Sequence, residues 1–334
     1  MSDTVLAELS NDLVYATMFV LTLAMIGFAY DLAVAGRRGR QDADVEVDAD
    51  VAVEAKVAVS VGSSDAPRAR SAGGSTTNLS GSGIRTKASN IAYSLTWLSL
   101  VLLTGAVLAR GFAAGRVPWG NMYEFALTTA WSVLALYLVL SRKYDLQWMG
   151  VLVVTPVLLS LGLSVAVLYT DTAELVPALR STWLIIHVSA AVISYGLFSI
   201  GAIASSLYIA KSSFEEKGSP SGGLGFLARI PTAKAIDTVS YRIHAFVFPL
   251  WTFAVIAGAI WAENAWGRYW GWDPKETWAF ITWVIYAGYL HARATAGWKG
   301  RRVAVIALVG FASLNFNFFI VNMVLPGLHS YSGV

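Results

Sequence analysis

The apolar run LVYATMFVLTLAMIGFAYDLAV, residues 13–34, decides the fold class of this 334-residue chain. It has the length of helix, roughly 20 residues, that crosses the ~30 Å hydrocarbon core of a bilayer. Seven further apolar runs follow along the chain: Ile91 to Ala109, Asn121 to Leu140, Leu146 to Thr170, Ser181 to Ala210, His244 to Ala262, Thr277 to His291 and Val303 to Leu325. Because a helix satisfies its own backbone hydrogen bonds in lipid, these runs predict an all-α polytopic bundle of about eight transmembrane helices.

The composition places the chain in the lipid bilayer and excludes several kinds of chemistry. Apolar residues make up 56% of the sequence and charged residues only 13%, whereas soluble domains carry about 25% charged residues. The chain has no cysteine, which excludes disulfides, thiolate metal ligands and thiol redox chemistry by this chain itself. Nothing in the composition indicates a nucleic-acid partner. The sequence also lacks a Walker loop, a dinucleotide-binding glycine fingerprint, an HExxH helix and a nucleophile elbow.

Charge divides the chain into three parts. Residues 1–35 hold the first membrane helix, whose start, MSDTVLAELSND, lacks the basic character of a signal peptide and predicts a retained anchor. Residues 36–90 begin with acid-and-valine alternation (DADVEVDADVAVEAKVAV) and continue with Ser, Gly and Arg, which predicts a disordered cytoplasmic linker. Residues 91–334 hold the remaining seven spans, with an external segment at residues 264–278.

Tryptophan is concentrated in one short connection between the sixth and seventh spans, WGRYWGWDPKETW, residues 266–278. We call it the tryptophan segment. Indole faces offer a planar ligand an apolar platform, glycines allow close approach to the backbone, and basic side chains meet anionic groups. The residues of these three kinds are Trp266, Gly267, Arg268, Trp270, Gly271, Trp272, Lys275 and Trp278. The alternative is an aromatic belt at the headgroup level, which is common in membrane proteins.

The end of the tryptophan segment has the pattern of a helix start. Asp273 is a suitable N-cap, Pro274 suits the first helical position, and Glu276 completes a capping-box pattern. Asp273 therefore has two candidate roles, capping the helix and orienting a neighbour of a ligand, and these roles are compatible.

The distribution of basic residues orients the bundle. All but five of the 24 lysines and arginines fall in alternate loops that share one side of the membrane. The exceptions are Arg110, Arg116, Arg180, Arg268 and Lys275. Loops rich in Lys and Arg remain in the cytoplasm, so we expect both termini and the tryptophan segment on the extracytoplasmic face of the cell membrane.

Two of the four histidines are expected on the same side as the tryptophan segment. His187 lies about 9 Å inside the fifth span at 1.5 Å per residue, and His329 follows the eighth span. Two imidazoles beside an aromatic platform can supply both axial ligands of a heme iron. The alternative is a hydrogen-bonded packing histidine at His187 and an exposed tail histidine at His329.

The remaining histidines are expected toward the cytoplasm. His291 lies about 22 Å along the seventh span from Glu276, too far to join the same site. It marks either a second, deeper heme position or an interfacial histidine beside Arg293, and the sequence leaves both open. For His244 we expect an ordinary interfacial role. The three asparagines of the last span predict interhelical hydrogen bonds: Asn315, Asn317 and Asn322.

Three motifs carry a family resemblance. WGRYWGWDPKETW resembles the WWD signature of heme-handling membrane proteins. PWGNMYEFALTTAW, residues 118–131, and VNMVLPGLHSYSG, residues 321–333, resemble segments of the CcsA (ResC) family of system II cytochrome c biogenesis. The resemblance extends from about Asn90 to the end of the chain.

This resemblance implies a function and a set of partners. It implies His187 and His329 as outer axial ligands of heme b carried as cargo, His291 as a transmembrane heme ligand, and a WWD surface that presents heme. Arg180, Arg268 or Lys275 would lie near the heme propionates. The product in the family is a thioether bond between heme vinyl groups and the CxxCH thiols of an exported apocytochrome c.

The family works as part of a holocytochrome c synthase (heme lyase) complex. Its implied partners are a ResB/Ccs1-type membrane protein, apocytochrome c and thiol-reducing thioredoxin-like proteins. Two alternatives remain open: a WWD heme chaperone or exporter of system I, and an organic-anion transporter in which histidines relay protons.

Overall fold

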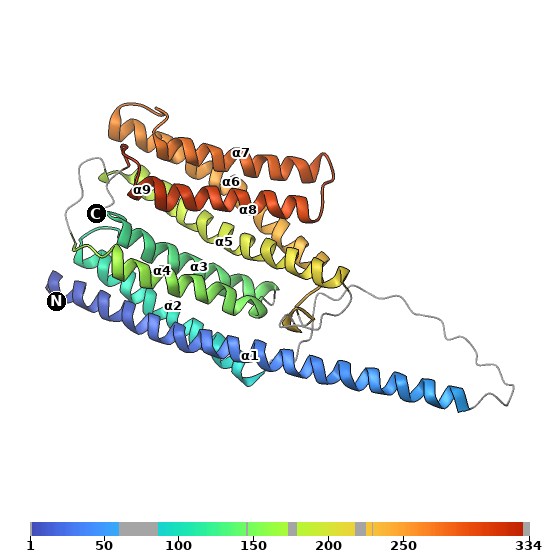
Figure 1. Ribbon diagram of the computed structural model, residues 1–334. Coiled ribbons are helices and arrows are strands. Elements are labelled where there is room, and N and C mark those ends of the chain that lie inside the picture. The colour runs from blue at the N-terminus through green and yellow to red at the C-terminus, as the bar shows by residue number, and fades with distance from the viewer. Residues whose placement is uncertain are drawn as a thin grey trace.

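The computed structural model describes residues 2–59, 86–144, 146–172, 179–217, 225–228 and 230–329, and of residues 35–59 only the backbone. Its elements form a bundle of long helices (Figure 1). In chain order they are α1 (Asp3–Val59), α2 (Lys87–Ala113), α3 (Met122–Tyr144), η1 (Gln147–Met149), α4 (Gly150–Val167), α5 (Thr182–Glu216), η3 (Gly225–Ala228), α6 (Ala233–Trp266), α7 (Pro274–Ala294), α8 (Arg301–Asn315), η4 (Phe316–Ile320) and α9 (Val321–Met323).

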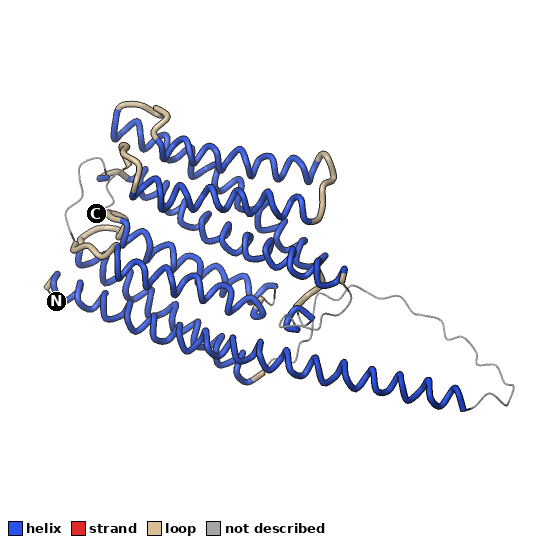
Figure 2. Tube along the Cα trace, in the orientation of Figure 1, coloured by secondary structure: helices blue, strands red, loops and turns tan. Residues whose placement is uncertain are grey.

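The predicted all-α polytopic fold is confirmed. Among the described residues, seven stretches are long and apolar enough to cross a membrane, and they coincide with seven of the eight expected spans. The eighth, α7, has the length of a span, with 21 residues, but is less apolar. It lies beside α6 and α8 in the bundle (Figure 1). Figure 2 shows that the described part of the chain is almost entirely helix, with short connections.

The bundle is built from neighbouring pairs of helices. Helix α1 packs along α2, α5 along α6, and α7 along α8, while α3 and α8 both contact α5. Most of the buried apolar side chains form one core that includes residues from all of these helices. Helix α5 therefore lies at the centre, in contact with the helices on both sides of it.

The expected linker is corrected at its first half. Helix α1 continues to Val59, so residues 36–59 are helical, and Figure 1 shows this part extending past the other helices. The physical reason is that no Gly or Pro interrupts residues 40–59, and their alanines, glutamates and lysine favour a helix. At the other end, Thr86 caps α2, and residues 60–85 lie outside the described part of the chain.

The start of α1 and the connection between α6 and α7, which holds the tryptophan segment, lie at the same end of the bundle (Figure 1), and His329 contacts Trp266 of that segment. Contacts tie the N-terminal region to this end: Ser10 donates a hydrogen bond to the Ala106 carbonyl, and Tyr123 donates one to Asn11. We call it the tryptophan end. The start of α1, the tryptophan segment and His329 therefore share one end of the bundle.

Candidate functional site

The tryptophan segment is a tight connection that is closed by one carboxylate. Helix α6 ends at Gly267, which has the left-handed backbone angle φ of 70°. Glu276 Oε2 accepts hydrogen bonds from the backbone N–H groups of Gly271 (2.8 Å) and Asp273 (3.0 Å). Asp273 caps α7, and the predicted capping box with Glu276 is present. The helix start thereby fixes the shape of the loop.

The two glycines serve the chain itself. Gly267 allows the left-handed end of α6. A methyl group on Gly271 would lie within 1.6 Å of the Arg268 guanidinium, so Gly271 makes room for that side chain. Neither glycine is among the residues that line the cavity described below.

The four tryptophans of the segment point to different surroundings and do not form one platform. Trp270 lines the cavity, and Trp272 stands at 90° to it with ring centres 5.7 Å apart. Trp272 is 64% exposed and has φ of 58°, a strained backbone angle for a residue with a side chain. Trp266 packs on His329, and Trp278 packs on Phe316.

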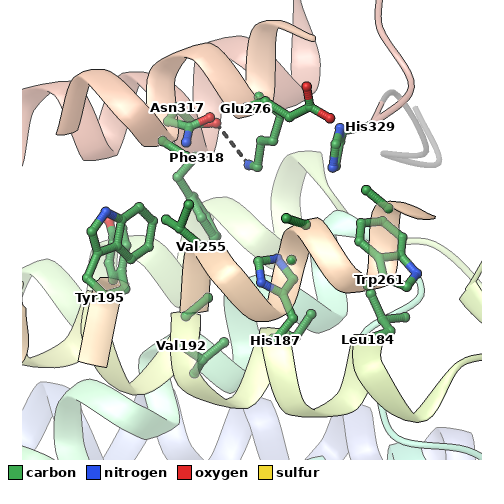
Figure 3. Close-up of a pocket in the computed structure, with 18 of the residues that line it drawn as sticks. Leu184, His187, Val192, Tyr195, Val255, Trp261, Glu276, Asn317, Phe318 and His329 are labelled. Atoms are coloured by element: carbon green, nitrogen blue, oxygen red, sulfur yellow. Dashed lines mark hydrogen bonds between the residues drawn. The ribbon is translucent and has the colours of Figure 1, made fainter. Parts of the chain in front are cut away.

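A cavity opens among the helices at the tryptophan end. It encloses about 1110 Å³ of space between atoms, a volume that includes the solvent at its open side. Side chains from α3, α5, α6, α7, α8, η4 and α9 line it, together with His329 of the C-terminal tail. Figure 3 shows His187, Trp261 and His329 around one part of the cavity and Tyr195 farther along it.

His187 is held against the backbone of α6. Its Nδ1 lies 2.7 Å from the Ala254 carbonyl oxygen, and because a carbonyl only accepts, Nδ1 carries the proton and donates. The ring fits because residue 258 is glycine: a methyl group there would lie 2.7 Å from the imidazole. The lone pair of the imidazole is therefore on Nε2, the nitrogen that suits a metal.

His329 is held in the same tautomer by a carboxylate. Its Nδ1 lies 2.9 Å from Asp273 Oδ2. The same carboxylate accepts from the backbone N–H groups of Leu328 (2.8 Å) and Lys275 (3.2 Å). Gly327 allows the tail to come this close, since a methyl group there would lie 2.7 Å from Asp273 Oδ1. Asp273 thus both caps α7 and orients His329, so its two expected roles coexist.

Electrostatics favour an ionised carboxylate at Asp273 and a neutral imidazole at His329. Burial acts to raise the pKa of Asp273, but hydrogen bonds from His329 and from the Leu328 and Lys275 backbone outweigh it and lower the pKa to about 2. Burial lowers the pKa of His329 below its ordinary value despite the hydrogen bond to Asp273. A neutral imidazole that donates through Nδ1 has its lone pair on Nε2, as a metal ligand requires.

Trp261 connects the two histidines and was missed by the sequence reasoning. Its ring is stacked with His187 at 6.0 Å between centres and meets His329 edge-on at 5.6 Å. It is only 1% exposed and belongs to a small core with Leu184 and Val188. No local pattern distinguishes it from other apolar residues of α6, because its role depends on contacts with α5 and the tail.

The other two histidines lie outside the cavity. His291 is exposed near the far end of α7 and is not among the lining residues, as its distance along the helix predicts. The interfacial role expected for His244 is wrong: its side chain is 0% exposed. It lies among aromatic rings, 5.4 Å from Tyr286 and 5.0 Å from Tyr289 between centres. The long helix α6 begins at Ala233, which places His244 three turns inside the bundle.

The basic residues of the tryptophan end differ in their relation to the cavity. Lys275 lines it, and its ammonium donates to the Asn317 carbonyl (3.0 Å) and to Asn322 Oδ1 (2.9 Å). Arg268 is paired with Glu276 at 3.4 Å, and Arg180 is exposed at the start of α5. Neither arginine is among the cavity-lining residues.

The asparagines of the last span partly meet expectation. Tyr195 donates to Asn315 and Lys275 donates to Asn322, which are the predicted interhelical hydrogen bonds. Asn317 and Asn322 also line the cavity, and Asn317 belongs to the π-helical turn η4. Packing alone is therefore too narrow a role for these two residues.

A buried ionic cluster supports the wall of the cavity formed by α3. Glu124 is 0% exposed and accepts from Arg110 Nε (3.2 Å), Arg116 Nη1 (2.7 Å) and the Gly120 N–H (2.7 Å). It thereby fixes the loop before α3. The next residue, Phe125, lines the cavity.

The family comparison agrees with this architecture. Residues 119–329 match the family model described as Cytochrome C assembly protein. This region contains His187, the tryptophan segment and His329. Fold and family model together define a class, the multi-pass membrane proteins of cytochrome c assembly.

Curated relatives narrow the class. The cytochrome c biogenesis protein CcsA of Guillardia theta is 37% identical over 256 residues, which cover 72% of this chain and 85% of the relative. CcsA of Synechocystis sp. (strain ATCC 27184 / PCC 6803 / Kazusa) is 35% identical over 292 residues, covering 72% and 86%. The chain belongs to the CcsA family of cytochrome c biogenesis proteins.

A solved structure shares the fold. The cytochrome c heme lyase CcmF superposes with a TM-score of 0.58 at 14% sequence identity, covering 96% of this chain and 47% of that chain. At this identity the likeness concerns the fold alone.

Proposed function

We propose that the protein holds heme b in the cavity at the tryptophan end, with His187 and His329 as axial ligands, and presents it for attachment to apocytochrome c. The observation that carries this proposal is the matching state of the two imidazoles. Each donates through Nδ1, one to a carbonyl and one to a carboxylate, so that each has its lone pair on Nε2. Both line the same cavity.

The surroundings fit a large planar ligand. Aromatic and aliphatic side chains dominate the lining, and Trp261 lies in contact with both imidazoles. Tyr269 and Trp270 of the tryptophan segment also line the cavity. Among basic residues, Arg180, Arg268 and Lys275 are the candidates for meeting the propionates at this end.

The work of this chain is positioning. Bound heme supplies the vinyl groups that form thioether bonds with the CxxCH thiols of apocytochrome c. The chain contributes no thiol, having no cysteine. His187 and His329 fix the position of the ring, the apolar walls exclude water, and the tryptophan segment borders the opening through which an apocytochrome would approach.

We further propose that the tryptophan end faces the extracytoplasmic side of the cell membrane and that the protein works in a heme lyase complex. A ResB/Ccs1-type membrane partner fits the exposed position of His291 on α7, since a second histidine from that partner would complete an inner heme site. Thioredoxin-like proteins would keep the apocytochrome thiols reduced.

The test is heme retention by variants of the full chain, purified with and without its partner. Alanine at His187 or at His329 is expected to lower bound heme and to change its absorption spectrum. His244→Leu is the matched control, because it removes a histidine that does not line the cavity. Unchanged heme content and spectra in both alanine variants would refute the ligand assignment. Colourless unmodified protein would favour an organic-anion transporter instead.

A further inference from the structure

One corner of the cavity holds the amine of Lys275, which forms no ion pair with a carboxylate of the described residues. Lys275 donates from Nζ to two neutral acceptors, the Asn317 carbonyl and Asn322 Oδ1. Within the described ranges no ion pair joins this ammonium to a carboxylate. An ammonium has three donors, so two neutral oxygens leave both charge and donor capacity available to a ligand in the cavity.

A second polar group at the same corner is unsatisfied. Asn317 is 3% exposed and lines the cavity, and its Oδ1 has no hydrogen-bond partner. Buried amides that lack a partner are uncommon and costly. Figure 3 shows Asn317 and Phe318 together on one wall, with the dashed hydrogen bond to the Asn317 backbone. The π-helical turn at residues 316–320 places both on the cavity.

The other charged groups of the site are engaged elsewhere. Glu276, the carboxylate that lines the cavity, accepts from the Gly271 and Asp273 backbone and pairs with Arg268. Asp273 is occupied by His329 and by backbone N–H groups. The cavity therefore pairs two neutral imidazoles with one ammonium, a combination that favours an apolar ligand with an anionic group.

We infer that Lys275, Asn317 and Asn322 form a carboxylate subsite that binds one propionate of the heme held between His187 and His329. This inference rests on the proposed function and selects Lys275 from the three basic candidates. Lys275 supplies a compact charge with rotatable donors. Asn317 would complete the set after a turn of its amide by about 180°, which would present Nδ2–H to a carboxylate oxygen in place of the unpaired Oδ1. Phe318, with its ring centre 6.0 Å from the ammonium, borders the subsite on its apolar side.

The subsite gives the ring one orientation. The vinyl groups of heme lie on the part of the ring away from the propionates. An anchored propionate therefore turns the vinyl edge away from Lys275, while the two histidines fix only the plane of the ring. Lys275 is thus a specificity-determining residue for which edge of the ring meets the apocytochrome.

The test compares two probes, heme b and its dimethyl ester, in titrations of the purified full-length protein. The unmodified protein is expected to bind heme about 10- to 100-fold more tightly than the ester, as charge-assisted hydrogen bonds predict. Lys275→Met, which keeps the length of the side chain, should reduce heme affinity to that of the ester and leave ester affinity unchanged. Asn317→Leu should reduce the preference in the same direction.

Lys234→Met is the matched control, since it makes the same change at an exposed lysine outside the lining and should keep the full preference. Ester binding reports that each variant is folded, and Lys275→Arg provides a second variant that retains the charge and part of the preference. If Lys275→Met still binds heme more tightly than the ester, or if it weakens the binding of both probes equally, the subsite is refuted and the proposed function is not. Absence of binding of either probe to the unmodified protein would overturn the proposed function with it.

Discussion

Asp273→Asn separates the capping role of this residue from its role in orienting His329. The carboxylate accepts three hydrogen bonds, from the Lys275 and Leu328 backbone and from His329 Nδ1. Asparagine has one acceptor oxygen and is as good an N-cap as aspartate, so it can keep the start of α7. Its NH₂ group, however, must face one of the former donors. Because Oδ2 accepts from both the Lys275 N–H and His329, an asparagine that keeps the cap turns its NH₂ group toward the Leu328 N–H, the former partner of Oδ1.

The substitution therefore breaks the hydrogen bond between Leu328 and residue 273 and replaces the carboxylate that orients the neighbouring His329 with a neutral amide. Loss of a carboxylate that orients a ligating histidine lowers metal affinity by about 10- to 100-fold, or about 1.4 to 2.8 kcal/mol. We therefore expect heme affinity to fall by this factor while the thermal unfolding temperature in detergent changes little. Both are measured on the purified protein, by heme titration and by circular dichroism.

The control is Asp171→Asn, the same chemical change at an exposed carboxylate beside Tyr169. It should leave both heme affinity and unfolding temperature unchanged. Wild-type heme affinity and spectrum in Asp273→Asn would refute the argument that the carboxylate orients His329 for binding iron. Unfolding without selective loss of heme would show that capping is the dominant role.

Three further predictions follow from the packing. Gly258→Ala should weaken heme binding in titrations about tenfold, because the added methyl group would lie 2.7 Å from His187. The control Gly288→Ala should bind heme as the unmodified protein does, because no atom lies within 4 Å of its methyl group. Equal heme affinities of the two variants would contradict this prediction. His291→Ala should leave the spectrum of heme in the cavity of the isolated chain unchanged, and an altered spectrum would place His291 in that site. Glu124→Gln leaves two arginines without their counter-ion and should lower the free energy of unfolding by about 3–5 kcal/mol. The measurement is the thermal unfolding temperature, which should fall. An unchanged temperature would refute the stabilising role of the buried ionic cluster.

Several features of the site follow from local sequence. The capping box at Asp273 and Glu276 is a contact over three residues, so the pattern alone predicts it. The separation of His291 from the cavity follows from the fixed rise of a helix. The opposite holds for His244: its burial depends on where α6 begins, and helix starts are the least certain part of a sequence-based prediction.

The contacts that shape the cavity are not local. His187 meets Ala254, 67 residues away, and His329 meets Asp273, 56 residues away. Trp261, Gly258 and the orphaned amide of Asn317 matter only because α5, α6 and the last span come together. Asn317 in particular faces the cavity through a π-helical turn that no residue pattern marks.

The sequence by itself determined that this is a multi-pass helical membrane protein, because long apolar runs have no other stable form in lipid. It also determined where the tryptophan segment ends and α7 begins. Only the tertiary structure decided which ring nitrogen of each histidine carries the proton, that Trp261 stands in contact with both, and that Lys275 turns toward the cavity. The reason is physical: helices are set by spacing along the chain, whereas a tautomer or an uncompensated charge is set by the partner that packing brings within hydrogen-bond distance.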